Sequence, residues 1–402
     1  MKFISGIREI ELIRDDLVIR AFEEYYECRP DWLSSAPGRV NLIGEHTDYN
    51  GGFVLPAAIN LQIKIGCHLR GDEFLNLYSG YHNESASFSL SSRLRPLGEK
   101  GWYSYFLAVV DQFHERGAIV PGMDVMIFGD VPIGAGLASS AAYEVGTAAM
   151  INAICKTGLS LKEIALLSQK AEYSDFIGVK CGIMDQFISS MAKREHALLI
   201  DCHSSEVKPV PFDSDQAKII IIDTMKKRGL VDSEYNQRRR ECEEGFQVIL
   251  EASEESFPSI RHIPFSIFEK FKDKLSEKQR KRLRHNLSEN RRVLDFVDAL
   301  NQGDFIKAGG LLYQSHESLK KDYEVSCEEL DFIVEEAGKI EGVFGCRMTG
   351  AGFGGCVLAL VRPDKADEFS NTITNQFSHR FHNKPEIYTT TPIDGVKVRF
   401  IN

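Results

Sequence analysis

Four side chains able to bind or neutralise charge fall within ten residues of one another, in the segment 37–52. They are Arg39, Glu45, His46 and Asp48. The carboxylates are acceptors for adjacent sugar hydroxyls, and the arginine presents a fixed positive fork to a phosphate group. A polar surface turn is the competing interpretation, because the segment ends in an Asn-Gly pair typical of hairpins.

A second segment, 132–142, places glycines and serines ahead of a helix of small residues. Gly134 and Gly136 let the backbone approach an anion closely, while Ser139 and Ser140 offer hydroxyls to phosphate or to Mg2+. No Gly-Lys-Ser/Thr follows, so this is not a Walker loop. The pattern predicts a phosphate-binding loop, with a tight turn and a serine cap as the alternative.

Asp185 stands close to Gly182 in the segment 181–187, after a helical stretch that carries Glu172 and Asp175. An isolated aspartate is more often a helix cap or a surface group than a catalytic residue. The chemical role of Asp185 therefore depends on what the other segments imply.

A fourth segment, 348–356, satisfies Gly-x-Gly-x-x-Gly. A dinucleotide-binding loop opens a helix, whereas a strand-like apolar run follows here at once. The pattern excludes a Rossmann dehydrogenase and leaves open a glycine loop packed near phosphate or substrate.

Short apolar runs alternate with longer helical stretches, which predicts an α+β fold. The clearest helix is 161–176, because Ser160 and Glu163 form a Ser-x-x-Glu capping pair, and 234–335 is helical in period. Prolines and aspartates at 209–215 predict a linker or long turn, and with the chain length they predict domains 1–210 and 211–402. The predicted strands are 39–43, 53–59, 63–69, 123–128, 197–200, 218–223, 345–348 and 356–361.

The 402 residues carry a formal charge of −10 with 43% hydrophobic residues. That composition supports a folded core and argues against nucleic acid as a partner. A basic run at 281–292 alternates with leucines and a valine at helical spacing, which favours a solvated helix face over a nucleic-acid patch.

Nine cysteines are spread along the chain with no Cys-x-x-Cys pair, so we expect mostly reduced, buried thiols. The N-terminal 20 residues mix charges into their apolar residues, unlike a signal peptide, and no run approaches the roughly 18 apolar residues of a membrane span. We therefore expect a cytoplasmic protein without a membrane partner.

Taken together, the segments resemble the GHMP family of small-molecule kinases, and within it the galactokinases. Residues 39–50 look like the galactokinase signature, 132–142 like the ATP loop and 348–356 like the C-terminal glycine loop. Further matches at 223–224, 233–242, 315–319 and 325–331 extend the resemblance over residues 31–361 in the family's order. It implies two lobes with the active site between them, ATP and Mg2+ as cofactors, and galactose as the sugar phosphorylated at its anomeric hydroxyl. Oligomeric state stays open, a monomer included.

The resemblance also implies roles for single residues. Asp185 matches the active-site aspartate, either a general base or a group that orients the hydroxyl, and Arg39 the arginine near the γ-phosphate. Ser140 matches the magnesium-coordinating serine, and Trp102 and Tyr105 resemble the aromatics near adenine. The positions that match sugar contacts are Glu45, His46, Asp48, Gly182 and Tyr235.

Two departures stand out. Ala138 and Ala142 replace serines common in the ATP loop of the family. The helix carboxylate expected at the magnesium site normally lies 12 residues before the active-site aspartate, but Glu172 lies 13 before Asp185. Either Glu172 keeps the role through a helix irregularity, or Asp175 replaces it.

Two rival functions remain. Another GHMP sugar 1-kinase, for N-acetylgalactosamine, arabinose or fucose, would share the phosphate machinery. A non-catalytic galactokinase-like sensor would bind sugar and ATP without turnover, although the retained Ser139, Ser140 and Asp185 favour an enzyme.

Overall fold

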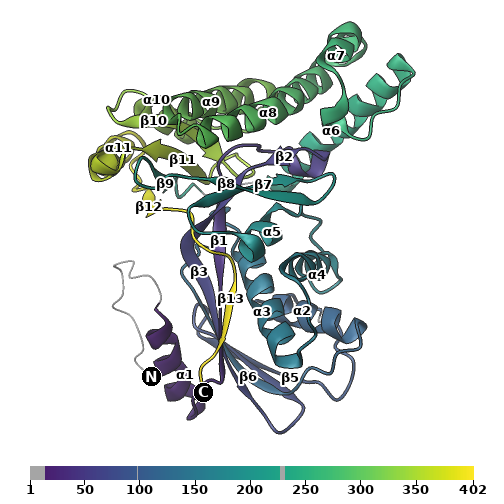
Figure 1. Ribbon diagram of the computed structural model, residues 1–402, viewed down its shortest axis with the longest axis vertical. Helices are drawn as coiled ribbons and strands as arrows, with labels where there is room; N and C mark the ends of the chain where they lie inside the picture. The colour runs from purple at the N-terminus through teal and green to yellow at the C-terminus, as the bar shows by residue number, and fades with distance from the viewer. Residues whose placement is uncertain (1–13, 97, 227–230) are drawn as a thin grey trace.

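The computed structural model of the 402-residue chain describes residues 14–96, 98–226 and 231–402. They form three sheets and two sets of helices. One set lies toward one end of the long axis, and the other lies beside the largest sheet (Figure 1). The element types agree with the α+β prediction.

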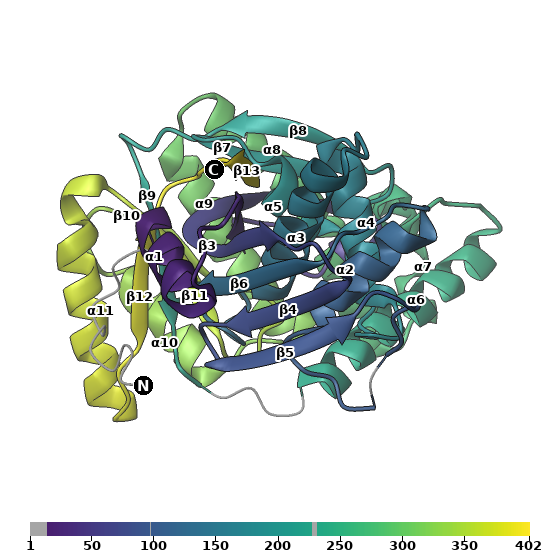
Figure 2. The same cartoon turned by 90° about the horizontal axis from the view of Figure 1, so that it is seen from below.

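The largest sheet has six strands in the order β13-β1-β3-β6-β4-β5. All neighbours are antiparallel except β4 and β6. Helices α2 to α5 cover one face, and α1 (Asp15–Tyr26) lies on the other (Figures 1 and 2). The strands are β1 (Trp32–Asn41), β3 (Pro56–Leu69), β4 (Phe74–Ser79), β5 (Glu84–Ser89), β6 (Met123–Gly129) and β13 (Lys397–Phe400), and the helices are α2 (Ser104–Glu115), α3 (Ser139–Cys155), α4 (Leu161–Tyr173) and α5 (Met184–Met191).

A four-stranded sheet, β10-β11-β9-β12, carries the helices of the C-terminal half, and a small sheet, β2-β7-β8, lies near the middle of Figure 1. The strands are β2 (Phe53–Val54), β7 (His196–Asp201), β8 (Glu206–Pro211), β9 (Lys218–Asp223), β10 (Val343–Thr349), β11 (Cys356–Val361) and β12 (Glu386–Thr390). The helices are α6 (Val231–Ser253), α7 (Phe265–Phe271), α8 (Glu277–Asn301), α9 (Phe305–Ser318), α10 (Glu328–Ala337) and α11 (Ala366–Phe381).

The inner strands of the four-stranded sheet, β9 and β11, are apolar and buried on both faces. Ile219 and Ile221 of β9 join the core that also fills the first sheet and its helices, whereas Ile220 and Ile222 join a second core under α6 to α11. The two halves of the chain therefore share one hydrophobic core across β9.

Most of the predicted elements lie where the sequence indicated. The Ser160–Glu163 capping box opens α4 with both reciprocal hydrogen bonds, although the helix ends at Tyr173, three residues earlier than predicted. Every predicted strand overlaps a strand of the structure, but some bounds are wrong. The segment 39–43 covers only the end of β1, and 53–59 and 63–69, predicted as separate strands, both run into β3, with Phe53 and Val54 forming β2. The division into domains 1–210 and 211–402 stays a prediction, and β13 returns from the end of the chain to pair with β1.

Two predictions about surface segments are wrong. Pro209 and Pro211 lie in β8, an edge strand, where proline is tolerated because it does not need to donate a hydrogen bond to a second neighbouring strand. The turn begins only at Asp213. The basic run of α8 is not a wholly solvated face, because Arg282 is 0% exposed and pairs with Glu241 and Glu324.

All nine cysteines are free thiols, as expected. Only Cys67, Cys242, Cys346 and Cys356 are buried and the other five are partly exposed, so the expectation of mostly buried thiols is wrong. Across residues 14–96, 98–226 and 231–402, no helix combines the length and hydropathy needed to span a bilayer.

Candidate active site

A two-point ion pair joins β1 to the first turn of α5. The Arg39 guanidinium donates to both carboxylate oxygens of Asp185, Nε to Oδ1 at 2.8 Å and Nη2 to Oδ2 at 2.7 Å. The Arg39 side chain is 10% exposed and that of Asp185 26%, so solvent reaches the carboxylate more than the guanidinium. This bidentate geometry fixes the direction of the carboxylate.

The same arginine is joined to the glycine–serine loop. Arg39 Nη1 donates to the Gly136 carbonyl at 2.5 Å, and the Arg39 amide donates to the Leu137 carbonyl at 3.0 Å. Gly134 and Gly136 have φ of 81° and 82°, and Ala138 reaches 62°, so the loop uses left-handed conformations just before α3. Ser139 and Ser140 are the first two residues of α3, where backbone N–H groups lack helical acceptors.

Glu172 faces this loop from the last turn of α4. Its buried carboxylate interacts with the Ser140 hydroxyl, accepts from Gln186 Nε2 at 2.6 Å and lies 2.9 Å from Cys181 Sγ. Burial, with the charge of Asp185, raises the pKa of Glu172. Asp175, the alternative residue, lies beyond the end of α4 and is exposed.

The Ser140 hydroxyl and the Glu172 carboxylate suit Mg2+, which prefers oxygen ligands and takes the remainder from phosphates and water. In the described part of the chain, no group of three or more His, Cys, Asp or Glu side chains could hold a metal alone. A site completed by nucleotide phosphates agrees with that sparse ligand set.

Asp48 and Gly182 lie against each other in the neighbourhood of Asp185. A Cβ added to Gly182 would lie 2.1 Å from Asp48 Oδ2, so any other residue at this position would displace the Asp48 carboxylate. Burial, with the negative charges of Asp185 and Glu45, raises the pKa of Asp48 to about 6. An acceptor group is thus held beside the Asp185 carboxylate.

Aromatic rings complete this side of the site. His46 is 4% exposed and has φ of 62°, and its ring lies 5.8 Å from the ring of Tyr235 at the start of α6. His46 Nδ1 is 2.8 Å from the Tyr49 hydroxyl, and the Tyr49 and Tyr235 rings are 5.1 Å apart. Asp48 and Asp185 both act on the pKa of Tyr235, which burial raises.

The carboxylate of Glu45, unlike that of Asp48, is surrounded by hydrogen-bond donors of the protein. Oε1 accepts from Arg347 Nη2, Thr349 Oγ1 and the Gly350 amide, each at 2.8 Å, and Oε2 accepts from Asn41 Nδ2 at 3.1 Å. Burial opposes ionisation, but Arg347 and these donors lower the pKa of Glu45. The glycine loop 348–356 is thereby tied to the signature segment.

The two predicted adenine-side aromatics lie at the start of α2, Trp102 just before the helix and Tyr105 in its first turn. Trp102 donates from Nε1 to Glu84 Oε2 at 3.1 Å and stacks on His82 at 6.4 Å. The Tyr105 ring lies 6.1 Å from that of Tyr143 in α3, and burial together with the charges of Glu172 and Glu144 raises the pKa of Tyr105. Tyr105 therefore lies on the Glu172 side of the site.

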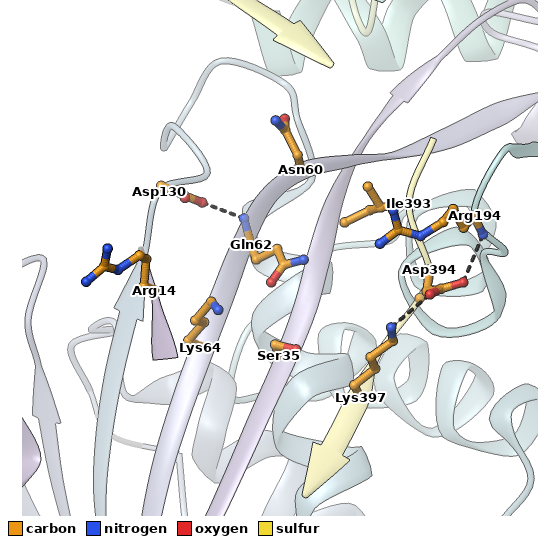
Figure 3. Close-up of a pocket in the computed structure, with 11 residues that line it drawn as sticks. Arg14, Ser35, Asn60, Gln62, Lys64, Asp130, Arg194, Ile393, Asp394 and Lys397 are labelled. Atoms are coloured by element: carbon orange, nitrogen blue, oxygen red, sulfur yellow. Dashed lines mark hydrogen bonds and ion pairs between the residues drawn. The ribbon is translucent and has the colours of Figure 1, made fainter. Parts of the chain in front are cut away.

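Neither of two separate surface cavities contains these residues. One of about 290 Å³ opens where the segment 393–397 crosses β1 and β3, with Lys64, Arg194 and Lys397 among its lining (Figure 3). The other, of about 710 Å³, is lined by 70–73, 90–93 and 114–122.

Sequence reasoning missed the residues that support the site from a distance. Gln186 links Glu172 to the buried Glu144, Arg347 holds Glu45, and Tyr323 reaches Tyr49. Only the position of Gln186 next to Asp185 offered a signal, because the others come from parts of the chain more than 250 residues away in sequence.

A bidentate Arg–Asp pair beside a glycine–serine loop at a helix N-terminus, with acceptor side chains nearby, suits a small-molecule kinase that transfers phosphate to a hydroxyl. Three family models match the chain. They are the galactokinase galactose-binding signature at residues 20–67, the GHMP kinase N-terminal domain at 104–193 and the GHMP kinase C-terminal domain at 296–379.

Solved structures agree. Galactokinase from Lactococcus lactis, crystallised with galactose, superposes with a TM-score of 0.88 at 33% identity, covering 95% of this chain and 99% of that one. Mevalonate kinase from Methanococcus jannaschii, at 21% identity, shares the fold with a TM-score of 0.65 over 90% of this chain and 98% of its own. The chain belongs to the galactokinases of the GHMP kinase family and is an ATP-dependent sugar kinase.

Proposed function

We propose that this enzyme transfers the γ-phosphoryl group of ATP to the anomeric hydroxyl of galactose, giving galactose 1-phosphate and ADP. The observation that carries the proposal is the position of the Arg39–Asp185 pair. Arg39 is bonded to the proposed phosphate loop at Gly136, and Asp185 lies close enough to Asp48, which adjoins Gly182, to raise its pKa. A donor phosphate bound at the loop and an acceptor hydroxyl bound at Asp48 would meet at Asp185.

Asp185 accepts or orients the proton of the anomeric hydroxyl through a carboxylate oxygen. Arg39 keeps that carboxylate in place and presents positive charge toward the transferring phosphoryl group. Phosphoryl transfer depends mainly on alignment and charge neutralisation, so this pair supplies what the reaction needs from the protein.

The nucleotide side uses the backbone amides at the start of α3 and the hydroxyls of Ser139 and Ser140. Ser140 and Glu172 are the proposed Mg2+ ligands, and the bound ion would neutralise the charge of the β- and γ-phosphates. Trp102 and Tyr105 are the proposed walls of the adenine site, in line with the location of Tyr105 near Glu172.

The sugar side uses Asp48 as a hydroxyl acceptor, with His46 and Tyr235 forming a polar aromatic wall. Gly182 keeps the space that the Asp48 carboxylate occupies. Glu45 contributes to sugar contact mainly by fixing this segment, since its carboxylate oxygens already accept four hydrogen bonds.

A coupled ADP-release assay with MgATP tests the proposal against galactose, N-acetylgalactosamine, arabinose, fucose and glucose, with mevalonate as an outside control. We expect clear preference for galactose. Preference for another sugar would keep the kinase chemistry and overturn the assignment of the sugar site. Binding of galactose and ATP without turnover would indicate the sensor function instead.

A further inference from the structure

Tyr323 is a buried tyrosine that contacts two residues on the proposed sugar side of the site, His46 and Tyr49. It ends the π-helical turn Leu319–Tyr323 that continues α9. Its hydroxyl lies 2.9 Å from the Tyr49 hydroxyl and 3.1 Å from Cys242 Sγ, and its ring packs 4.6 Å from the ring of His46. Since Tyr49 contacts His46 Nδ1 at 2.8 Å, an unbroken chain of polar atoms runs from Cys242 to His46.

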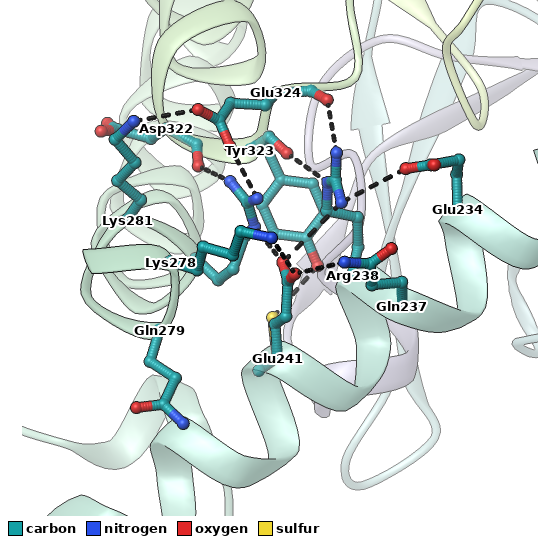
Figure 4. Close-up of polar contacts among 12 residues, drawn as sticks. Glu234, Gln237, Arg238, Glu241, Lys278, Gln279, Lys281, Asp322, Tyr323 and Glu324 are labelled. Atoms are coloured by element: carbon teal, nitrogen blue, oxygen red, sulfur yellow. Dashed lines mark hydrogen bonds and ion pairs between the residues drawn. The ribbon is translucent and has the colours of Figure 1, made fainter. Parts of the chain in front are cut away.

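Two buried arginines hold Tyr323 in this place. Arg238 Nε donates to the Tyr323 carbonyl at 2.9 Å, and Arg282 Nη1 donates to the Asp322 carbonyl at 2.5 Å (Figure 4). Arg282 also pairs with Glu241 and Glu324, each at 2.7 Å. Such a network leaves the tyrosine ring little freedom, because moving it would unpair buried charges.

Every member of the chain keeps its proton or stays neutral. Burial lowers the pKa of His46 to about 3, although the negative charge of Glu45 acts in the opposite direction. Burial raises the pKa of Tyr49 and Tyr323 well above the usual value and that of Cys242 to about 12. The imidazole therefore has one N–H and one acceptor nitrogen near pH 7.

The direction of the hydrogen bonds follows from acceptor strength. An imidazole nitrogen accepts better than a phenol oxygen or a thiol, so Tyr49 donates to His46 Nδ1 and Tyr323 donates to Tyr49. Cys242 accepts from Asn286 Nδ2 at 3.4 Å, which leaves its S–H to donate toward Tyr323. The proton of His46 is then on Nε2, which makes no well-formed hydrogen bond to a described residue, although the Ala351 backbone interacts with the ring.

We propose that Tyr323 and Tyr49 form a hydroxyl relay that holds His46 as the Nε2–H tautomer, so that His46 meets the sugar as a hydrogen-bond donor. The two tyrosines are positioning residues, because they act through His46. The inference rests on the proposed sugar site for its consequence, but the tautomer itself is a property of the free enzyme.

Nitrogen-15 NMR of imidazole-labelled free enzyme measures the tautomer directly. The His46 signals are assigned by their loss in His46→Gln. We expect an unprotonated Nδ1 and a protonated Nε2 in the wild-type protein, and movement toward a mixture of tautomers in Tyr49→Phe. A protonated Nδ1 in the wild type, or an unchanged spectrum in Tyr49→Phe, would overturn the relay.

A kinetic cycle tests whether Tyr323 acts through Tyr49. Tyr49→Phe should raise the KM for galactose about 3- to 10-fold, as loss of one oriented hydrogen bond does, with kcat and the KM for ATP near wild type. Tyr323→Phe should have a smaller effect, and the double variant should match Tyr49→Phe alone. Additive effects would contradict the relay.

Tyr313→Phe is the matched control, because Tyr313 lies in the same helix α9 and its buried hydroxyl has no partner in the described part of the chain. It should change neither the spectrum nor the KM. If the predicted tautomer is found but the wild-type enzyme prefers another sugar, the galactose assignment fails while the relay stands, and the kinetic cycle is then run with that sugar.

Discussion

Single side chains in this enzyme are oriented before substrates arrive. Asp185 is held at both oxygens by Arg39, and Arg39 is itself held by the Gly136 carbonyl. Preorganisation of this kind lowers the reorganisation that the reaction would otherwise require. The contribution of Asp185 should therefore appear in turnover rather than in sugar binding.

Asp185→Ala should lower kcat by about 100- to 10,000-fold, the usual range for a group that transfers or orients a proton. Galactose affinity, measured by calorimetry, should stay within a few-fold of wild type. Asp175→Ala is the control, since that carboxylate is exposed beyond α4. Substantial activity in Asp185→Ala would count against both the general-base and the orienting role.

Asp48 predicts a pH dependence. Its pKa is raised to about 6, so the carboxylate is protonated in mildly acidic solution and gains acceptor character as pH rises. Its folded-state pKa lies above the unfolded value, so its contribution to stability is present below about pH 4 and is lost as pH rises through about 6. Galactose kcat/KM should increase through the same window.

The measurement is kcat/KM for galactose from pH 5 to 8, with ATP saturating. His46, with a pKa of about 3, does not titrate in this range. Asp48→Asn should remove the inflection near pH 6 along with much of the affinity. A profile that keeps the inflection in Asp48→Asn would assign it to another group.

The Mg2+ requirement should depend on Glu172 and not on Asp175. Glu172→Gln should raise the half-saturating Mg2+ concentration at least 10-fold, because it removes the charge of the proposed oxygen ligand next to Ser140. Binding of Mn2+ to the enzyme with ATP, followed by electron paramagnetic resonance, checks this without turnover. A large loss in Asp175→Asn and none in Glu172→Gln would reverse the assignment.

At the scale of elements, β10 and β1 are joined by one buried arginine. Arg347 donates to the carbonyls of Asn41 and Leu42 and to Glu45, each at 2.8 Å, and is 0% exposed. The end of β1, which leads into the signature segment, is thereby fixed to the strand that precedes the glycine loop.

Arg347→Met should lower the free energy of unfolding by about 3–5 kcal/mol, because it leaves the Glu45 carboxylate buried without its counter-charge. Urea unfolding measures the change. Arg362→Met, in the more exposed pair with Asp364, should change it by less than about 1 kcal/mol. Equal effects of the two variants would show that burial of the pair is not what matters.

Local signals in the sequence were sufficient for the elements and for the segments that carry the chemistry. The Ser160–Glu163 capping box and the run of isoleucines in β9 each depend on residues close together in the sequence, so the sequence alone predicts them. Pro209 and Pro211 were misjudged because an edge strand tolerates proline, and edge or centre depends on pairing with β7. Arg282 was misjudged for a similar reason, since its partners Glu241 and Glu324 come from other elements.

The whole molecule is held together by contacts that cross the middle of the sequence. The four-stranded sheet shares a hydrophobic core with the six-stranded sheet through Ile219 and Ile221. Strand β13, near the C-terminus, pairs with β1. Trp32 packs on Phe400 of β13, with ring centroids 5.1 Å apart. These connections predict that the two halves lose structure together.

Both tryptophans, Trp32 and Trp102, lie in the first half of the chain, whereas α6 to α11 contribute much of the helical circular dichroism. In urea, tryptophan fluorescence and far-ultraviolet circular dichroism should therefore give coincident transitions in the wild-type enzyme. Arg347→Met weakens a link between the sheets, so the two curves should move to lower urea and separate. Transitions that are already separate in the wild type would mean that the shared core does not couple the two halves.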